Sequence, residues 1–238
     1  MTGYLPDNDY SQDSLRWGQL LRDKQLKTNP SHEDLDKLQD DIIKEADSAL
    51  AYFFAERFLY KSFRMQKVIL DKKVAKYAFM FAQHIPNADI KALQNIVVES
   101  KKIKYITHFA CFVKSADHEL LKDLIIDSGK VKYAHMYLKH VKGANVNDFK
   151  EVIINSGKPR YLFELAKHFD NPEDITRIEG CIIASGSFTY MRLFAEKIKL
   201  ANVEKIEQVV LDSNNSEEMQ RFARYVRRSR MKRFLLVV

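Results

Sequence analysis

The stretch that decides the fold is Tyr133–Gly157, which reads YAHMYLKHVKGANVNDFKEVIINSG. It carries two apolar patterns of helical period. Tyr133 and Tyr137 lie four residues apart, and Phe149 is followed by isoleucines four and five positions later. Positions i, i+4 and i+5 lie on one face of an α-helix. The stretch therefore predicts two short helices joined by a turn.

The same two patterns recur along the chain. The first, with an aromatic-type anchor, recurs at Phe54, Phe81, Phe109, Tyr137, Leu165, Phe194 and Phe222. The second, with a leucine-type anchor, recurs at Leu38, Met65, Leu93, Leu121, Phe149, Ile178 and Ile206. Each leucine-type anchor precedes the next aromatic-type anchor by 16 residues, whereas the return distance varies from 11 to 13. The constant spacing predicts two helices packed through a fixed turn, and the variable one a surface loop.

Polar and glycine residues mark the expected ends of these helices. Candidate N-caps lie four residues before a leucine-type anchor, at Asp34, Asp89, Asp117, Asn145, Asp174 and Asn202. Candidate left-handed residues close the same helices at Gly129, Gly157, Gly186 and Asn214. Helices this short are marginal alone and need neighbours. We therefore expect an all-α protein, an α-solenoid of about seven two-helix repeats.

The ends of the chain do not follow the repeat. In residues 1–31, Ser14–Leu26 reads as one capping helix, with Trp17 as a lid on the first repeat. Residues 32–230 are expected to form a single solenoid domain, whose last helix runs from Glu218 to about Arg230, and residues 231–238 a C-terminal tail.

Composition narrows the class of protein. With 7 Gly and 5 Pro the chain has too few turn residues for a β-sandwich. No apolar run approaches the roughly 20 residues of a membrane-spanning helix, so no membrane partner is expected. The two cysteines, Cys111 and Cys181, lie in apolar surroundings and fit core positions in a reducing compartment. A cytoplasmic or nuclear location is expected.

The repeat also resembles a known style of sequence. Written from this chain, it contains Phe-Ala-x-x-Val-x-x-Ala-Asn-Val and Ile-Ile-x-Ser-Gly, most clearly in Val141–Val146. It resembles the tandem helical repeats of hypothetical proteins from large DNA viruses and bacteriophages. The resemblance covers roughly residues 35–230 and implies a helical array and a viral source, in which case the location is the interior of the host cell. It implies no catalytic residue.

Motifs for catalysis or cofactors are not found in the sequence. It contains no Gly-rich phosphate loop, Cys-x-x-Cys, His-Glu-x-x-His or Gly-x-Ser-x-Gly, so neither an enzyme nor a cofactor is expected. His84, His140 and His168 share one repeat position. Stacked helices lie roughly 8–10 Å apart, too far for one zinc, whose ligands lie at about 2 Å. We expect no metal. Tyrosines at a shared position favour a structural role over base stacking.

A basic edge is the sharpest candidate site. Its residues lie in the turns that follow the leucine-type helices, and they are Lys102, Lys104, Lys130, Lys132, Lys158 and Arg160. Lys73 and Lys76 lie just before them in the array. Equivalent positions of successive repeats stack, so these cations predict a stripe that could bind phosphates. The alternative is that cations beyond a helix C-terminus merely offset the helix macrodipole.

Charge is uneven along the chain. Residues 1–48 hold six basic and eleven acidic residues, whereas residues 219–238 hold seven basic and no acidic ones. The cluster consists of Lys232 and six arginines, Arg221, Arg224, Arg227, Arg228, Arg230 and Arg233, of which Arg221, Arg224 and Arg228 would share a helix face. The cluster predicts an anionic partner, either a nucleic acid or the acidic N-terminus of another copy.

These patterns favour a non-catalytic scaffold that binds another macromolecule through the basic edge and the Arg-rich end. The first alternative is a nucleic-acid-binding protein that contacts the phosphate backbone. A helical-repeat enzyme acting on DNA is a distant third, because no carboxylate stands out beside an aromatic pocket.

Overall fold

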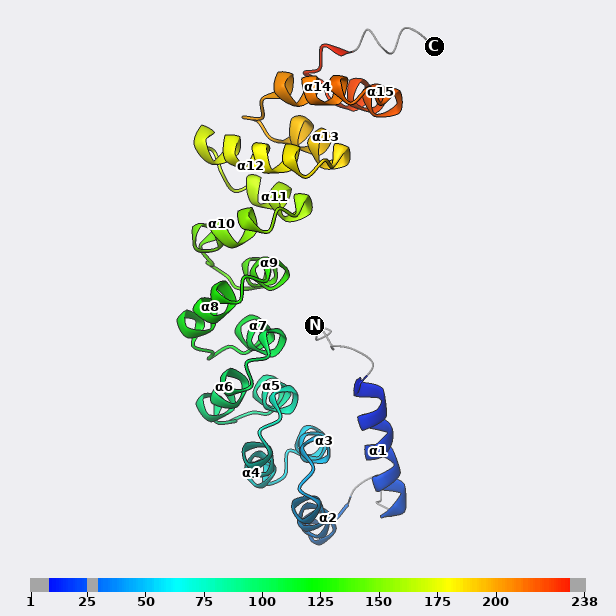
Figure 1. The fold of residues 1–238 in the computed structure, drawn as a ribbon. Helices are drawn as coiled ribbons and strands as arrows, with labels where there is room; N and C mark the ends of the chain where they lie inside the picture. The colour runs from blue at the N-terminus through cyan, green and yellow to red at the C-terminus, as the bar shows by residue number, and fades with distance from the viewer. Residues whose placement is uncertain (1–8, 25–29, 232–238) are drawn as a thin grey trace. The chain divides into compact units, whose positions relative to one another are not determined.

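A computed structural model describes residues 9–24 and 30–231 of the chain, with side chains from Gln12 onward. These residues form fifteen α-helices and no strand (Figure 1). The first eight are α1 (Asp9–Asp23), α2 (His32–Glu45), α3 (Ser48–Phe58), α4 (Ser62–Lys72), α5 (Ala75–His84), α6 (Ile90–Glu99), α7 (Ile103–Phe112) and α8 (His118–Asp127). The others are α9 (Val131–His140), α10 (Val146–Asn155), α11 (Pro159–Ala166), α12 (Pro172–Ala184), α13 (Phe188–Lys197), α14 (Val203–Asp212) and α15 (Ser216–Tyr225).

Helices α2–α15 form seven hairpins, each an even-numbered helix followed by an odd-numbered one. The chain divides into two compact units, here called the N-terminal unit (residues 1–124) and the C-terminal unit (residues 125–238), with the boundary inside α8. Within each unit the even-numbered helices form one layer and the odd-numbered helices the other (Figure 1). Within each unit successive hairpins pack in chain order, which confirms the predicted all-α, solenoid-type repeat fold.

Both columns of anchors form the core. All fourteen anchor side chains are buried, and the most exposed of them, Tyr137, has 3% of its surface in contact with solvent. The first residue of each apolar doublet is buried too, but the second is mostly half-exposed: Ile42 is 1% exposed and Ile43 37%. The narrow buried stripe is what two packed helix layers require.

Every hairpin turn contains one left-handed residue. These residues are Ala46, Lys73, Lys101, Gly129, Gly157, Gly186 and Asn214. The four positions predicted from glycine and asparagine are confirmed, and the other three carry side chains that disfavour this conformation. In five of the seven turns a serine precedes the left-handed residue and completes the turn, as where Ser156 Oγ donates to the Ile153 carbonyl at 2.7 Å and accepts from the Lys158 amide at 3.2 Å.

Most predicted N-caps of the even-numbered helices are confirmed. Asp89, Asn145 and Asn202 each accept a hydrogen bond from the first turn of their helix, and Asp117 accepts one from the Leu120 amide. The prediction was wrong for Asp34 and Asp174, because α2 and α12 begin one turn earlier. Their N-caps are Ser31 and Asn171, which leaves each aspartate in the first turn.

Neighbouring hairpins are also joined by the residue after each leucine-type anchor. Gln94 Oε1 accepts from the backbone amide of Asp117 at 2.8 Å, and Glu179 Oε2 from that of Asn202 at 2.7 Å. Both side chains are buried. At these two places a hairpin thus positions the start of the next, which supports the repeat register.

The capping helix and the last helix differ from their predicted bounds. Helix α1 begins at Asp9 rather than Ser14 and ends at Asp23, and Leu26 lies outside the described residues. It packs on α3, where Trp17 is 8% exposed and stacks on Phe53 with ring centroids 6.3 Å apart. Helix α15 ends at Tyr225, so Arg228 and Arg230 lie beyond it. Apart from Met231, the predicted C-terminal tail lies outside the described residues.

Candidate anion-binding site

The candidate site is the first turn of α9 and α11 in the C-terminal unit. Lys130 and Lys158 are the N-cap residues of these helices and make no side-chain cap. Lys132 and Arg160 are the second helical residues. All four side chains belong to exposed residues, and none forms an ion pair within the described chain. Four cations are thereby gathered at the start of two neighbouring odd-numbered helices.

A tyrosine follows each second-position cation. Lys132 Nζ lies 5.8 Å from the ring centroid of Tyr133, and Arg160 Cζ lies 6.0 Å from that of Tyr161. These distances are within reach of a cation–π contact. We call these two-residue elements the cation–tyrosine pairs. The N-terminal unit has two more, Lys76–Tyr77 in α5 and Lys104–Tyr105 in α7, with distances of 5.1 and 5.7 Å.

The macrodipole does not explain these cations. The sequence-based alternative placed them beyond a helix C-terminus, where a positive charge is favourable. In the structure Lys104, Lys132 and Arg160 lie instead inside the first turn of the following helix. The dipole there disfavours a cation by about 0.3–1 kcal/mol at an exposed position. An anion bound at the first turn of these helices would offset this unfavourable interaction between the cation and the dipole.

Several cations of the even-numbered layer behave differently, because they form ion pairs between neighbouring hairpins. In the N-terminal unit Lys61 binds Asp36 at 2.8 Å, and Lys73 binds Glu99 at 3.0 Å. In the C-terminal unit Lys150 binds Asp174 at 2.9 Å. Arg177 donates two hydrogen bonds to Glu151, which holds the pKa of that carboxyl below its ordinary value. In the C-terminal unit the cations of α10, α12 and α14 are thus paired, whereas the four cations at the start of α9 and α11 are not.

One cation–tyrosine pair of the N-terminal unit holds an acid from the same chain. Asp13 of α1 accepts hydrogen bonds from Lys76 Nζ, at 2.8 Å, and from the Tyr77 hydroxyl. Burial of Asp13 raises its pKa, but the hydrogen bonds from Lys76 and Tyr77 outweigh this and lower it below the ordinary value. The carboxylate is therefore held in its charged form. Sequence analysis missed Asp13, because it lies 63 residues from Lys76.

Three of the five arginines that the structure describes in this cluster have partners in the chain, and Lys232 and Arg233 lie outside the described residues. Arg221 binds Glu217 and Glu218 within α15 at 2.5 and 3.1 Å, and Arg230 pairs with Glu204. Arg228 donates to the carbonyls of Ala195, Ile198 and Lys199 at the end of α13. The predicted helix face shared with Arg228 is wrong, since α15 ends before it.

The two remaining arginines of the cluster are exposed. Arg224 lies in the last turn of α15 and Arg227 follows the helix, and neither forms an ion pair within the described chain. Among the described residues of the cluster, only these two stay available for an external anion. The cluster is therefore a weaker candidate than the sequence indicated.

A cavity of about 430 Å³ adjoins the candidate site. Its lining includes the polar residues His135, Arg160, Glu164 and His168, and the apolar residues Leu138, Val146, Ile153 and Leu165. Burial lowers the pKa of His135, so this imidazole is neutral at pH 7. Its ring lies 5.1 Å from that of Tyr161, which connects α9 with α11. The cavity offers both a cation and an apolar wall.

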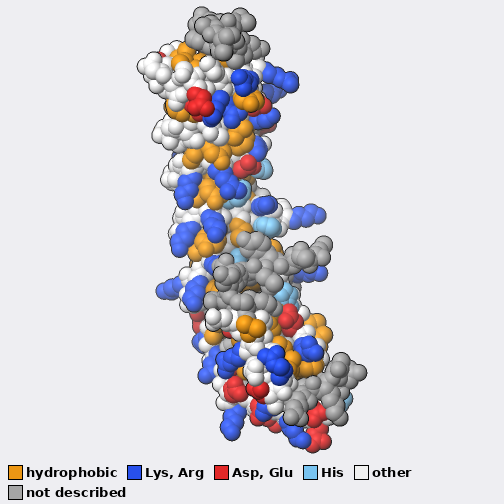
Figure 2. Space-filling view, turned by 90° about the vertical axis from the view of Figure 1, so that its right-hand side faces the viewer, with side chains coloured by type: hydrophobic (Ala, Val, Ile, Leu, Met, Phe, Trp, Pro, Cys, Tyr) orange, Lys and Arg blue, Asp and Glu red, His pale blue; other side chains and the backbone are white. Residues whose placement is uncertain are grey.

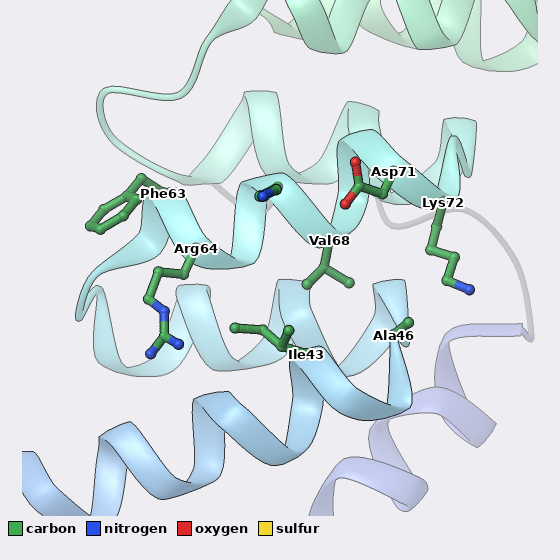
Figure 3. Close-up of a pocket in the computed structure, with 8 residues that line it drawn as sticks. Ile43, Ala46, Phe63, Arg64, Val68, Asp71 and Lys72 are labelled. Carbon is green, nitrogen blue, oxygen red and sulfur yellow. The ribbon is translucent and has the colours of Figure 1, made fainter.

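A second hollow, also of about 430 Å³, lies between α2 and α4 in the N-terminal unit (Figure 3). Ile43, Phe63 and Val68 give it an apolar wall. Its Arg64 donates to Asp40 at 2.6 Å, one of the ion pairs between neighbouring hairpins. The hollow therefore belongs to the paired even-numbered layer and is not part of the candidate site.

The odd-numbered helices present a mixed surface. Figure 2 shows Lys and Arg side chains beside hydrophobic ones on the side where these helices lie. Of the tyrosines in the pairs, Tyr77 is buried and Tyr105, Tyr133 and Tyr161 are half-buried, as the structural interpretation of this column expects.

His84 and Cys111 are both half-buried. In the described part of the chain no group of three or more His, Cys, Asp or Glu residues could hold a metal ion. His84 hydrogen-bonds to the Tyr52 hydroxyl at 2.7 Å through Nδ1. Burial raises the pKa of the Cys111 thiol to about 12, so it is not a nucleophile at neutral pH.

Comparisons of the chain with protein-family models, curated proteins and solved structures give no match. The resemblance to viral and phage repeats therefore stays a prediction. Among the described helices, none combines the length and the apolar character needed to cross a membrane.

Proposed function

We propose that the protein is a non-catalytic helical-repeat scaffold that binds an anionic segment of another macromolecule. The binding surface consists of the first turns of α9 and α11, with Lys130, Lys132, Lys158 and Arg160. The observation that carries the proposal is that these four cations have no ion-pair partner in the described chain, whereas the cations of α10, α12 and α14 in the same unit, Lys150, Arg177 and Lys205, are paired.

The physical reason is that the unbound surface is electrostatically unfavourable. Exposed cations close to one another repel, and two of them also face the positive end of a helix dipole. An anion removes both penalties and gains charge-assisted hydrogen bonds. Arg224 and Arg227 at the end of α15 add a secondary basic surface to the same unit.

A nucleic acid is the second candidate partner, since the same four cations could contact phosphates. The rings of Tyr133 and Tyr161 are half-buried and their faces are near Lys132 and Arg160, which favours phosphate contact over base stacking. This partner, the expected cytoplasmic or nuclear location and the implied viral source all stay predictions.

The test is binding of two polyanions, labelled polyglutamate and a labelled single-stranded oligonucleotide, to the full chain. We expect at least one to bind, with affinity falling roughly 50-fold between about 50 mM and about 200 mM salt if four ionic contacts form. Replacing Lys130, Lys132, Lys158 and Arg160 by glutamate should abolish binding in a fluorescence-anisotropy titration.

The matched control reverses Lys142 and Lys199, two exposed cations of the loops in the same unit. Binding should survive this change apart from a small general effect of net charge. If neither polyanion binds at low salt, or if the control lowers affinity as much as the fourfold reversal, the proposed function is wrong.

A further inference from the structure

We infer that the Lys132–Tyr133 and Arg160–Tyr161 pairs each bind a carboxylate of an acidic peptide segment from a partner protein, as Lys76–Tyr77 binds Asp13. This inference rests on the proposed function and specifies the chemistry of the partner. The inference is based on a contact within the chain itself, between α1 and α5 of the N-terminal unit.

The occupied pair shows how such a carboxylate is held. Asp13 Oδ2 accepts both from Lys76 Nζ and from the Tyr77 hydroxyl, so the two residues act as a two-donor clamp. The Lys76 side chain is only 12% exposed beneath α1. Trp17, one helical turn after Asp13, packs on Phe53. The bound segment is therefore an acid followed by an apolar side chain.

The two pairs of the C-terminal unit have the same local geometry. In all three helices the cation is the second residue, the tyrosine is the third, and the N-cap makes no side-chain hydrogen bond. The cation also lies over the tyrosine ring in each, at 5.1, 5.8 and 6.0 Å. Equal positions in equal first turns direct the two donors alike. At Arg160 the planar guanidinium adds a bidentate geometry suited to a carboxylate.

The surroundings favour a peptide over a phosphate backbone. The cavity beside Arg160 has an apolar wall that includes Leu138, Val146 and Leu165, which could hold an apolar side chain next to the acid. Glu164 lines the same cavity, but it is paired with Lys167 at 2.9 Å, and Lys139 adds a second cation to the lining beside Arg160.

The spacing of the pairs sets the spacing of the acids. Helices α9 and α11 are in contact through His135 and Tyr161, and packed helices lie roughly 8–10 Å apart. Two acids seven residues apart on a helix are separated by about 10.5 Å along its axis. A partner helix with acids at i and i+7 and apolar residues between them fits both pairs at once.

The experiment uses the full chain and three labelled probes. The first is a helical peptide with glutamates at i and i+7 and leucines between them, the second is its glutamine counterpart, and the third is a single-stranded oligonucleotide. Changing both tyrosines (Tyr133→Phe and Tyr161→Phe) should weaken binding of the glutamate peptide by roughly tenfold or more, because each loses a hydrogen bond to a charged group. The glutamine peptide should bind weakly to both proteins.

Tyr190 provides the matched control. It is the third residue of α13 and half-buried, but it follows Thr189 instead of a cation. Tyr190→Phe should leave the affinity for the glutamate peptide unchanged, and circular dichroism should show both tyrosine variants folded. An equal loss with Tyr190→Phe, or no loss with the double variant, contradicts the inference.

The oligonucleotide separates this inference from the proposed function. The partner is a nucleic acid if the oligonucleotide binds more than about tenfold tighter than the glutamate peptide and if this binding is lost when all four cations are replaced by glutamate. The inference then fails and the proposed function holds. If neither probe binds, both fail.

Discussion

The N-terminal and C-terminal units use the same repeat but differ in what covers their cation–tyrosine pairs. In the N-terminal unit α1 covers Lys76–Tyr77 and supplies Asp13. In the C-terminal unit no described acid pairs with Lys132 or Arg160. The hairpins have the same form with or without an acid at this position, so the acid is not required for the hairpin fold. The comparison indicates a binding element that the chain fills itself in only one unit.

The units also differ in the turns of their hairpins. The left-handed position is Ala46, Lys73 or Lys101 in the N-terminal unit and Gly129, Gly157 or Gly186 in three of the four turns of the other. The same backbone is thus more strained at the N-terminal turns. Three predictions, from the largest effect to the smallest, test how alike the two units are.

The largest effect is expected at the anchors. Phe81 and Phe194 occupy the same repeat position in the two units and are fully buried. Phe81→Ala and Phe194→Ala should each lower the free energy of unfolding by about 3–5 kcal/mol, measured by urea denaturation. Phe63→Ala, at a position 72% exposed, is the control and should change it by less than about 0.5 kcal/mol. A mild effect in one unit would show that its repeats are not packed like the other's.

An intermediate effect is expected at Asp13, because its carboxylate holds α1 on α5. Asp13→Asn should weaken docking of α1 by about 1–2 kcal/mol. The fluorescence of Trp17, the sole tryptophan, reports it, since its ring packs on Phe53. The folded pKa of Asp13 is lowered, so the contribution is fully present above the ordinary value of 3.8 and is lost as pH falls below it.

In acid, Trp17 emission should therefore shift toward that of an exposed indole below about pH 4. The amide created by Asp13→Asn does not titrate. This variant should therefore show the shifted Trp17 emission already at neutral pH, and lowering the pH should change the emission little further. An unchanged emission in the variant would contradict the role of Asp13 and, with it, the model for the C-terminal pairs.

The smallest effect is expected at the turns. Gly157→Ala should destabilise the protein by about 1 kcal/mol, because a side chain disfavours the left-handed backbone there. The reverse change in the N-terminal unit, Lys101→Gly, should stabilise it by about 0.5 kcal/mol, since strain relief exceeds the added unfolded-chain entropy. Thermal denaturation measures both. If both changes destabilise equally, the turns of the two units do not differ in strain.

Most of the fold was predictable from the sequence. The sixteen-residue spacing identified every hairpin, and all fourteen anchors are buried as expected. The ends of helices were less predictable: Asp34 and Asp174 were expected as N-caps, but Ser31 and Asn171 extend their helices by a turn. Several polar residues near a helix start can cap it, and the choice depends on packing with the neighbouring hairpin.

The candidate site was predictable only in part. Lys130, Lys132, Lys158 and Arg160 could be identified as a recurring group, but whether they were paired could not. Arg228 and Arg230 were expected to be equally available, yet they bind the end of α13 and Glu204. Such partners lie more than twenty residues away, and a repeat pattern does not encode which side chains meet across the stack.

By itself the sequence determined the helical period, the hairpin turn and the repeat length, because these depend on interactions within about thirty residues. Only the tertiary structure decided which cations remain unpaired and that Asp13 occupies the Lys76–Tyr77 pair. The reason is that an ion pair requires two side chains to meet in space. Their meeting depends on how α1 and the successive hairpins pack.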